Sequence, residues 1–151
     1  MGEAWRIVKE RHAASALDGE GARLHGGRWN SAGVRVVYTS FAKSLAALEI
    51  LVHVRPPVAF RYVAIRLRFD DALVERFPPE SLPRGWDDEP PSMVSQRIGD
   101  AWVKGARSVL LMLPSVLTRE PNFLVNPAHP DFARIRVGKP EPFAFDPRLS
   151  R

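Results

Sequence analysis

The chain has 151 residues, of which 45% are hydrophobic and 26% charged, proportions typical of one folded globular domain and not of a disordered protein. It has no cysteine, which excludes disulfides, thiolate metal sites and a cysteine nucleophile. Its formal net charge of +5 favours anionic partners such as nucleotides, nucleic acids or acidic proteins. No apolar run reaches the roughly 20 residues of a membrane-spanning helix, and the N-terminal residues lack the apolar core of a signal peptide. We therefore expect a cytoplasmic protein.

Hydrophobic and turn patterns predict the elements of the first half of the chain. In order, they are a strand at 4–9, a helical turn at 10–18, a glycine-rich loop at 19–34, a strand at 35–39 and a helix at about 41–54. Ser40 is a candidate N-cap for this helix, because its hydroxyl can accept a hydrogen bond from the first turn. The helix should end before Pro56 and Pro57. Its apolar side chains predict burial on most sides, with Glu49 and His53 on one narrow polar stripe.

The second half combines further strands with one helix. The predicted elements are a strand at 60–69, a proline-rich surface excursion at about 70–92, a helix at 93–106, short strands at 108–114, 123–127 and 132–138, and an edge strand in the C-terminal tail. Alternation makes 60–69 a half-buried antiparallel strand, with Tyr62, Ala64, Arg66 and Arg68 on one face. Several strands with few helices, outside βαβ alternation, predict an α+β fold. We expect one compact domain over residues 1–151, with mostly antiparallel strands.

The glycine-rich loop concentrates residue types that bind anions. Gly26 and Gly27 would let backbone N–H groups approach an anion closely, and the guanidinium of Arg28 can hold phosphate through two hydrogen bonds. Trp29 is costly to expose, and Asn30 can orient a ligand through its amide. The spacing matches neither a P-loop nor the dinucleotide fingerprint, so an ordinary surface turn is the alternative.

Glu49 is the only carboxylate of the predicted helix at 41–54. Among so many apolar neighbours, it either points to solvent with His53 or is held in the protein for a reason. In the second case a nearby cation such as Arg28 would stabilise its charge. A carboxylate in this place could stabilise an oxocarbenium ion or direct a nucleophile onto one.

Two further candidates lie at the ends of predicted strands. The ring of Tyr38 could stack on a base, or it could be a core aromatic whose hydroxyl is satisfied. Ser115 follows a buried strand and Pro114, a frequent place for a site residue. The histidines are too scattered for the spacing of a metal site, so no metal is expected.

Five motifs follow one another between about residues 4 and 138: WRIV, GGRWNSAG, VVYTS, LAALEILVH and LPS…PNFLVNPAHPDF. In this order and spacing they resemble the RES-domain toxins of bacterial RES–Xre toxin–antitoxin systems. The resemblance implies a fold related to ADP-ribosyltransferase toxins, with NAD as substrate. It implies catalytic roles for Arg28, Tyr38, Glu49 and Ser115. The expected NAD-binding residues are Arg6, Gly27, Trp29, Asn30 and Asn122.

The chemistry of NAD suits these residues. Its pyrophosphate would bind Arg28, its nicotinamide ring would stack on Tyr38 or Trp29, and Glu49 would stabilise the oxocarbenium-like state as the bond to ribose breaks. Nicotinamide is a cationic leaving group, so no metal is required. The resemblance implies hydrolysis or phosphorolysis of NAD, or transfer of its ADP-ribose to a protein, and leaves the choice among these acceptors open.

The resemblance also implies partners. A cognate Xre-type antitoxin would cover the site, and the chain could form a homodimer within a toxin–antitoxin assembly. A second hypothesis is a basic nucleic-acid-binding module without catalytic activity, in which Tyr62, Arg66 and Arg68 form a stacking and phosphate platform. Direct nucleic-acid binding is the weaker hypothesis, because the concentrated glycines, Arg28 and Glu49 do not lie on that strand.

Overall fold

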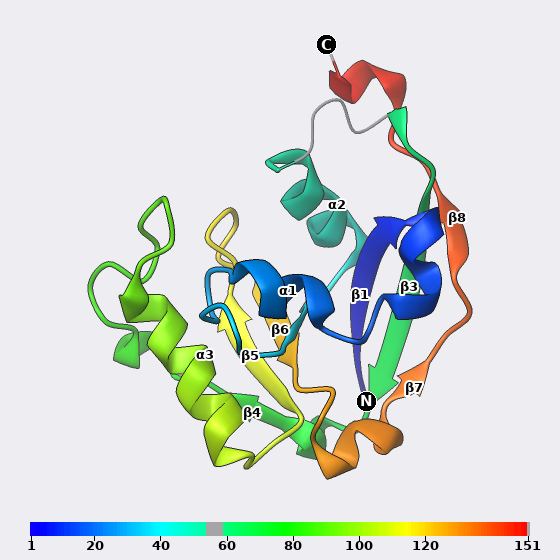
Figure 1. The fold of residues 1–151 in the computed structure, drawn as a ribbon. Coiled ribbons are helices and arrows are strands. Elements are labelled where there is room, and N and C mark those ends of the chain that lie inside the picture. The colour runs from blue at the N-terminus through cyan, green and yellow to red at the C-terminus, as the bar shows by residue number, and fades with distance from the viewer. Residues whose placement is uncertain (54–58, 151) are drawn as a thin grey trace.

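One mixed sheet organises the computed structural model, which describes residues 1–53 and 59–150 (Figure 1). Its strands are β1 (Gly2–Lys9), β2 (Val37–Ser40), β3 (Tyr62–Phe69), β4 (Val74–Arg76), β5 (Leu110–Pro114), β6 (Pro121–Val125), β7 (Arg136–Val137) and β8 (Glu141–Phe143). The sheet order is β4-β5-β6-β2-β1-β3-β7, and β8 also pairs with β3. All recorded pairs are antiparallel except β4 with β5. The expected α+β fold, in a single compact domain, is confirmed.

Three α-helices accompany the sheet in the described residues: α1 (Glu20–His25), α2 (Lys43–Leu51) and α3 (Met93–Gly105). Short 3-10 segments cover Glu10–Ser15, Asp71–Leu73, Pro79–Ser81, Pro130–Arg134 and Pro147–Ser150. In Figure 1, α2 lies next to β1 and α3 lies beside β4 and β5. No helix of the described chain is long and apolar enough to cross a membrane.

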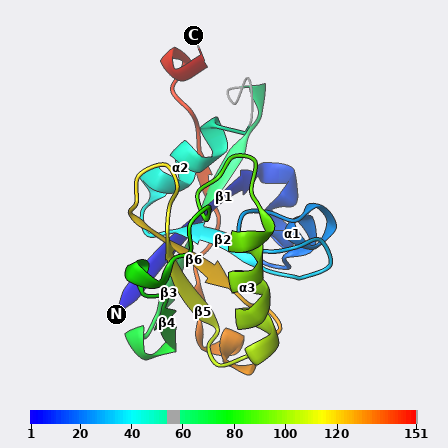
Figure 2. The ribbon, with the colours of Figure 1, turned by 90° about the vertical axis from the view of Figure 1, so that its left-hand side faces the viewer.

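The two longer helices cover the same face of the sheet. Trp5 of β1 packs in one cluster with Ala46 of α2, and Leu111 of β5 packs in another with Trp102 of α3. Figure 2 looks from the side of α3 and shows α1 beside it. Because successive side chains of a strand point to opposite faces, a third cluster around Phe123 belongs to the other face. In that cluster, the side chains that cover the sheet come from 3-10 and connecting segments, among them Leu17, Leu73 and Phe132.

β1 and β2 pair only briefly, and this positions the candidate site. Their register holds a single pair, Trp5 with Ser40. By contrast, β2 pairs with β6 over four residues, from Val37 opposite Val125 to Ser40 opposite Asn122. The half of the sheet that carries β4, β5, β6 and β2 is therefore joined to the β1–β3 half through a narrow contact, and α2 begins just beyond it.

Several predictions for the first half need correction. Ser40 does not cap α2, because it ends β2 and Ala42 occupies the N-cap without a side-chain hydrogen bond. Residues 20–25 of the predicted loop form α1. Leu48 is 38% exposed, and Val52, which follows α2, is 48% exposed, so this part of the chain is buried only where it faces the sheet. The predicted polar stripe of Glu49 and His53 is also wrong, since α2 ends at Leu51 and His53 lies beyond it. The positions 54–58, including the two prolines expected to end the helix, lie outside the described residues.

The second half differs from its prediction in three places. Tyr62 and Ala64 are buried as well as the opposite face of β3, so that strand is half-buried only near Arg66 and Arg68. The surface excursion contains β4, which pairs parallel with β5. Most of 132–138 is 3-10 helix or irregular, and only Arg136–Val137 joins the sheet. The predicted helix at 93–106 is confirmed as α3, and the tail contributes the edge strand β8.

Candidate functional site

Glu49 turns toward the sheet and accepts two hydrogen bonds on one oxygen. Its Oε1 accepts from Ser115 Oγ at 2.8 Å and from Asn122 Nδ2 at 2.9 Å. The backbone N–H of Leu117 donates to Ser115 Oγ at 3.1 Å, which leaves the hydroxyl proton for Glu49. Oε2 makes no hydrogen bond within the part of the chain that the structure describes. The carboxylate is therefore fixed through one oxygen and available through the other.

Strand register explains why these three side chains meet. Leu113 of β5 lies opposite Asn122 of β6, and Ser115 follows Leu113 by two residues, so it continues on the same face. That face is the one under α2 and α3. Ser115 is only 1% exposed, while Glu49 and Asn122 are half-buried. A half-buried carboxylate is protected from bulk water but remains reachable from the molecular surface.

Tyr38 ties the glycine-rich loop to the same face. Its hydroxyl donates to Asn30 Oδ1 at 2.6 Å and accepts from the backbone N–H of Trp29 at 3.0 Å. A Cβ built on Gly27 would lie 2.6 Å from the Tyr38 hydroxyl, so only glycine allows this approach. Burial raises the pKa of Tyr38 well above its ordinary value, so its hydroxyl stays neutral and serves as a hydrogen-bonding anchor.

Asn30 and Trp29 are committed to the loop itself. Asn30 is fully buried, and its Nδ2 donates to the carbonyls of Ala22, Ser31 and Val34. Trp29 is 3% exposed, and its ring stacks on Trp86 with centroids 5.8 Å apart. Their direct contact with NAD stays a prediction; what the structure shows is that both give the loop its shape.

The helix α3 supports the loop from outside. Its Asp100 accepts from the backbone N–H of Ser31 at 2.9 Å and also from the Ser31 hydroxyl. Ser95 Oγ donates to the carbonyl of Arg28 at 2.6 Å. A Cβ on Gly99 would lie 1.7 Å from the carbonyl oxygen of Trp29, so the helix and the loop touch through backbone atoms. The loop conformation therefore depends on a helix almost 70 residues later in the chain.

Arg28 is held by the segment 86–89. Its Nη1 donates to the carbonyls of Trp86 at 3.1 Å and Asp88 at 2.7 Å, and its Nη2 donates to Glu89 Oε2 at 2.8 Å. The side chain of Arg28 is 13% exposed and that of Glu89 is 74% exposed. One guanidinium nitrogen is thus fixed by backbone, and the other meets a carboxylate that water largely surrounds.

Arg6 occupies the narrow junction between β1 and β2. Its Nε donates to the carbonyl of Ala16 at 2.6 Å, and its Nη1 donates to the carbonyl of Tyr38 at 3.0 Å. Burial lowers the pKa of the Arg6 guanidinium, and the charge of Asp18 opposes that shift. Because Trp5 packs under α2, Arg6 points to the other face of the sheet. It reaches the site through the Tyr38 backbone.

The candidate site has two parts, the loop anchored by Tyr38 and the Glu49–Ser115–Asn122 cluster. Both parts lie on one face of the sheet. Ser40 lies opposite Asn122, and Tyr38 lies opposite Leu124. Tyr38 and Asn122 are thus diagonal neighbours on adjacent strands, about 7–8 Å apart by general strand geometry. The structure therefore brings Tyr38 and its loop next to the Glu49–Ser115–Asn122 cluster, which the sequence alone did not establish.

Comparison with known proteins identifies the family of this chain. The sequence model of the RES-domain family matches residues 3–146 of this chain. The chain belongs to the RES family. The resemblance drawn from the five sequence motifs is thereby confirmed over nearly the whole chain.

Relatives of this RES domain span similar lengths. A Sphingobium protein named "Prs ADP-ribosylating toxin" is 40% identical over 97% of this chain and 96% of its own. A Yersinia enterocolitica protein named "Toxin Res" is 35% identical over 96% of this chain and 97% of its own. Among solved structures, the Mycobacterium tuberculosis MbcT–MbcA toxin–antitoxin complex contains a chain with a TM-score of 0.79 at 16% identity, over 95% of this chain and 84% of that one. At that identity the likeness shows a shared fold.

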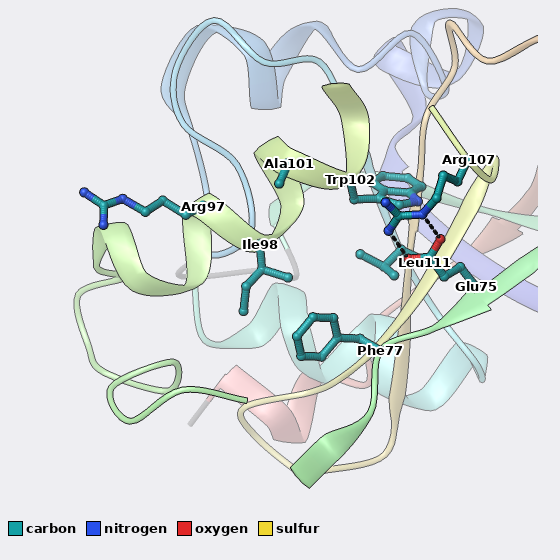
Figure 3. Close-up of a pocket in the computed structure, with 8 residues that line it drawn as sticks. All are labelled: Glu75, Phe77, Arg97, Ile98, Ala101, Trp102, Arg107 and Leu111. Atoms are coloured by element: carbon teal, nitrogen blue, oxygen red, sulfur yellow. Dashed lines mark hydrogen bonds and ion pairs between the residues drawn. The ribbon is translucent and has the colours of Figure 1, made fainter. Parts of the chain in front are cut away.

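The candidate site of this RES domain coincides with neither of two cavities found among the described residues. A cavity of about 330 Å³ lies between α3 and β4–β5, as Figure 3 shows, and a second of about 440 Å³ lies near Phe60. In Figure 3, Arg97 extends away from the other lining residues, and Glu75 pairs with Arg107. Neither cavity is lined by Arg28 or Glu49. Segment 86–89 covers the Arg28 side instead. Among the described residues, no cluster of His, Asp or Glu is placed to hold a metal.

Sequence reasoning missed the residues that support Arg28 in this RES domain. Trp86 and Glu89 belong to the proline-rich excursion, from which no role was predicted. A tryptophan beside three consecutive acidic residues, Asp87, Asp88 and Glu89, was the available signal, because such a segment can pair with an arginine elsewhere. The stacking platform of the nucleic-acid hypothesis is wrong for Tyr62, which is 3% exposed.

Proposed function

We propose that this chain is the toxin of a toxin–antitoxin pair and that it consumes NAD by breaking the bond between ribose and nicotinamide. The observation that carries the proposal is the state of Glu49, held on Oε1 by Ser115 and Asn122 and free of hydrogen bonds on Oε2 within the described residues. A carboxylate fixed in this way is preorganised to stabilise positive charge that develops beside it. The Sphingobium relative is named an ADP-ribosylating toxin, which supports the same substrate.

The proposed reaction is a substitution at C1′ of the ribose. The C1′–N bond breaks, and its electron pair stays on the nicotinamide nitrogen, which loses its positive charge. The ribose then carries oxocarbenium charge, which Glu49 stabilises. Water, phosphate or a protein side chain forms the new bond at C1′ with a lone pair. Water or a protonated side chain then releases a proton to solvent, whereas an ionised phosphate oxygen has none to release.

The other site residues would bind and orient NAD. Asn122 Oδ1 is buried without a hydrogen-bond partner, and a hydroxyl or carboxamide of the substrate would satisfy it. Arg28 would hold the pyrophosphate through Nη2, whereas Gly27, whose N–H already donates to the carbonyl of Asn30 at 2.9 Å, would act by shaping the loop. Trp29, Asn30 and Tyr38 would act by shaping the loop. Arg6 would hold the Tyr38 backbone from the other face.

The partner in the proposal is an antitoxin of the Xre type that covers Glu49 and Arg28. The structural neighbour from M. tuberculosis is described as part of a toxin–antitoxin complex. The net charge of +5 of this chain would favour an acidic antitoxin segment. Binding over the site would exclude NAD, and release of the antitoxin would permit NAD loss and growth arrest.

A product analysis tests the proposal. Purified protein, free of antitoxin, is incubated with NAD, with and without phosphate and cell lysate, and the products are separated by mass. We expect nicotinamide together with ADP-ribose, its phosphate ester or an ADP-ribosylated protein, according to the acceptor. Arg28→Ala and Glu49→Gln should each abolish NAD loss and relieve growth arrest, whereas Glu80→Gln at an exposed position should do neither. Intact NAD under all these conditions would exclude the proposed function.

A further inference from the structure

Arg119 links the two parts of the candidate site. It belongs to the turn between β5 and β6, and its backbone N–H donates to the carbonyl of Ser115 at 2.9 Å. Its side chain reaches the segment over Arg28: Nη2 donates to Asp87 Oδ2 at 2.9 Å, and the guanidinium lies 4.7 Å from the ring centre of Trp86. The residue next to the Glu49 cluster thus also contacts the segment that holds Arg28.

The backbone of Arg119 is in an unusual state. Its φ is +67°, in the left-handed region that glycine adopts without strain and other residues rarely adopt. An arginine in this place costs conformational energy that a glycine would not. Such a residue is a candidate for a functional role of its side chain.

Trp86 contacts two flat groups. The ring of Trp29 stacks on it at an interplanar angle of 20°, and the guanidinium of Arg119 lies within cation–π distance. This arrangement places the Trp86 carbonyl against Arg28 Nη1. Arg28 Nη2 pairs with the exposed Glu89, a contact that a stronger anion can replace.

We propose that Arg119 is a positioning residue for Arg28. By holding Trp86 and Asp87, it keeps two backbone carbonyls on Arg28 Nη1, so that Nη2 is presented to a phosphate of the substrate. The proposal rests on the proposed function in that the anion is the pyrophosphate of NAD. The orientation of Arg28 by segment 86–88 does not depend on that identity.

Kinetics of an Arg119→Gly variant test the proposal, because glycine suits the backbone and removes only the side chain. We expect the KM for NAD to rise about fivefold, because the variant loses a cation–π contact of about 1 kcal/mol, which corresponds to about that factor. We expect kcat to stay within about twofold of the wild type and Tm not to fall. Arg119→Lys should restore part of the KM. Arg84→Ala removes the same charge from an exposed arginine two residues before Trp86 and should leave KM unchanged.

Two results would overturn the proposal. One is a wild-type KM in Arg119→Gly, and the other is a fall in kcat that follows a fall in Tm, which indicates a structural role only. Amide hydrogen exchange without NAD separates this proposal from the proposed function. If the wild type leaves NAD intact, exchange decides: faster exchange across 84–89 in Arg119→Gly, with α2 unchanged, supports positioning, and unchanged exchange in 84–89 refutes it.

Discussion

Glu49 and Ser115 lie 66 positions apart in the chain and are joined by a hydrogen bond of 2.8 Å. The bond connects α2 with the end of β5. It determines which way the carboxylate points, because the same oxygen also accepts from Asn122.

Ser115→Ala tests this relationship. Loss of one donor to a charged acceptor should weaken the orientation of Glu49 and lower kcat for NAD cleavage about 10- to 100-fold, since a hydrogen bond to a charged group contributes about 1.5–3 kcal/mol. KM should change little, because Arg28 is untouched. Ser44→Ala, at an exposed position of α2, is the matched control. Steady-state kinetics with wild-type values for Ser115→Ala would contradict this role.

Glu89→Gln should strengthen substrate binding. Glu89 pairs with Arg28 Nη2 and is 74% exposed, so it competes with the pyrophosphate for the same nitrogen. Removing the charge should lower the KM for NAD up to about fivefold, because an exposed ion pair contributes at most about 1 kcal/mol. Glu80→Gln, at another exposed glutamate, should leave KM as it is. An unchanged KM in Glu89→Gln would show that the pair does not obstruct the substrate.

Two helical glycines should respond in opposite directions to alanine. Gly99→Ala places a methyl group 1.7 Å from the Trp29 carbonyl, and the forced separation of α3 from the loop should cost about 1–3 kcal/mol. Gly21→Ala in α1 meets no atom within 4 Å and should stabilise the protein by about 0.5–1 kcal/mol. Urea denaturation measures both. Equal effects of the two substitutions would mean that the close contact is not present in solution.

The ion pairs of Glu20 should make stability depend on pH. The side-chain hydrogen bond from Arg23 is the main cause that lowers the pKa of Glu20 from 4.5 to about 2, with a contribution from Arg35. The stabilisation is therefore complete above pH 4.5 and is lost as the pH falls through about 2. Glu20→Gln should lower Tm at pH 7 but not near pH 2. Because the group is exposed, about 1 M NaCl should reduce the difference. A Tm difference that persists near pH 2 would exclude this cause.

Local patterns predicted the elements that local forces determine. The apolar spacing at 93–106 predicted a helix, and α3, which Ser92 caps, follows that prediction. The alternation at 60–69 correctly identified β3. In contrast, β4 has only three residues, and its strand conformation depends on pairing with β5. Patterns within a single segment do not reveal such pairing.

The candidate site was likewise predicted only in part. Arg28, Glu49 and Ser115 were predicted from their motifs, but the sequence left the direction of Glu49 open. The contacts of Arg28 with Trp86 and Glu89 span about 60 positions. The periodicity of side chains within one segment does not predict a contact over such a sequence separation. Asn30 and Trp29 were expected to meet the substrate, because their residue types suit it. Their burial could not be seen without the position of α3.

The central position of β6 in the sheet has a consequence for folding during synthesis. β6 lies between β5 and β2 and provides Asn122, so the part of the chain that carries Arg28 and Glu49 is synthesised well before the strands that orient them. A growing chain cannot complete the Glu49 cluster until Val125 has left the ribosome, since domains fold as units while synthesis proceeds from the N-terminus. Under the proposed function, the chain would therefore become active only after β6 has been synthesised, which gives an antitoxin already present time to bind it.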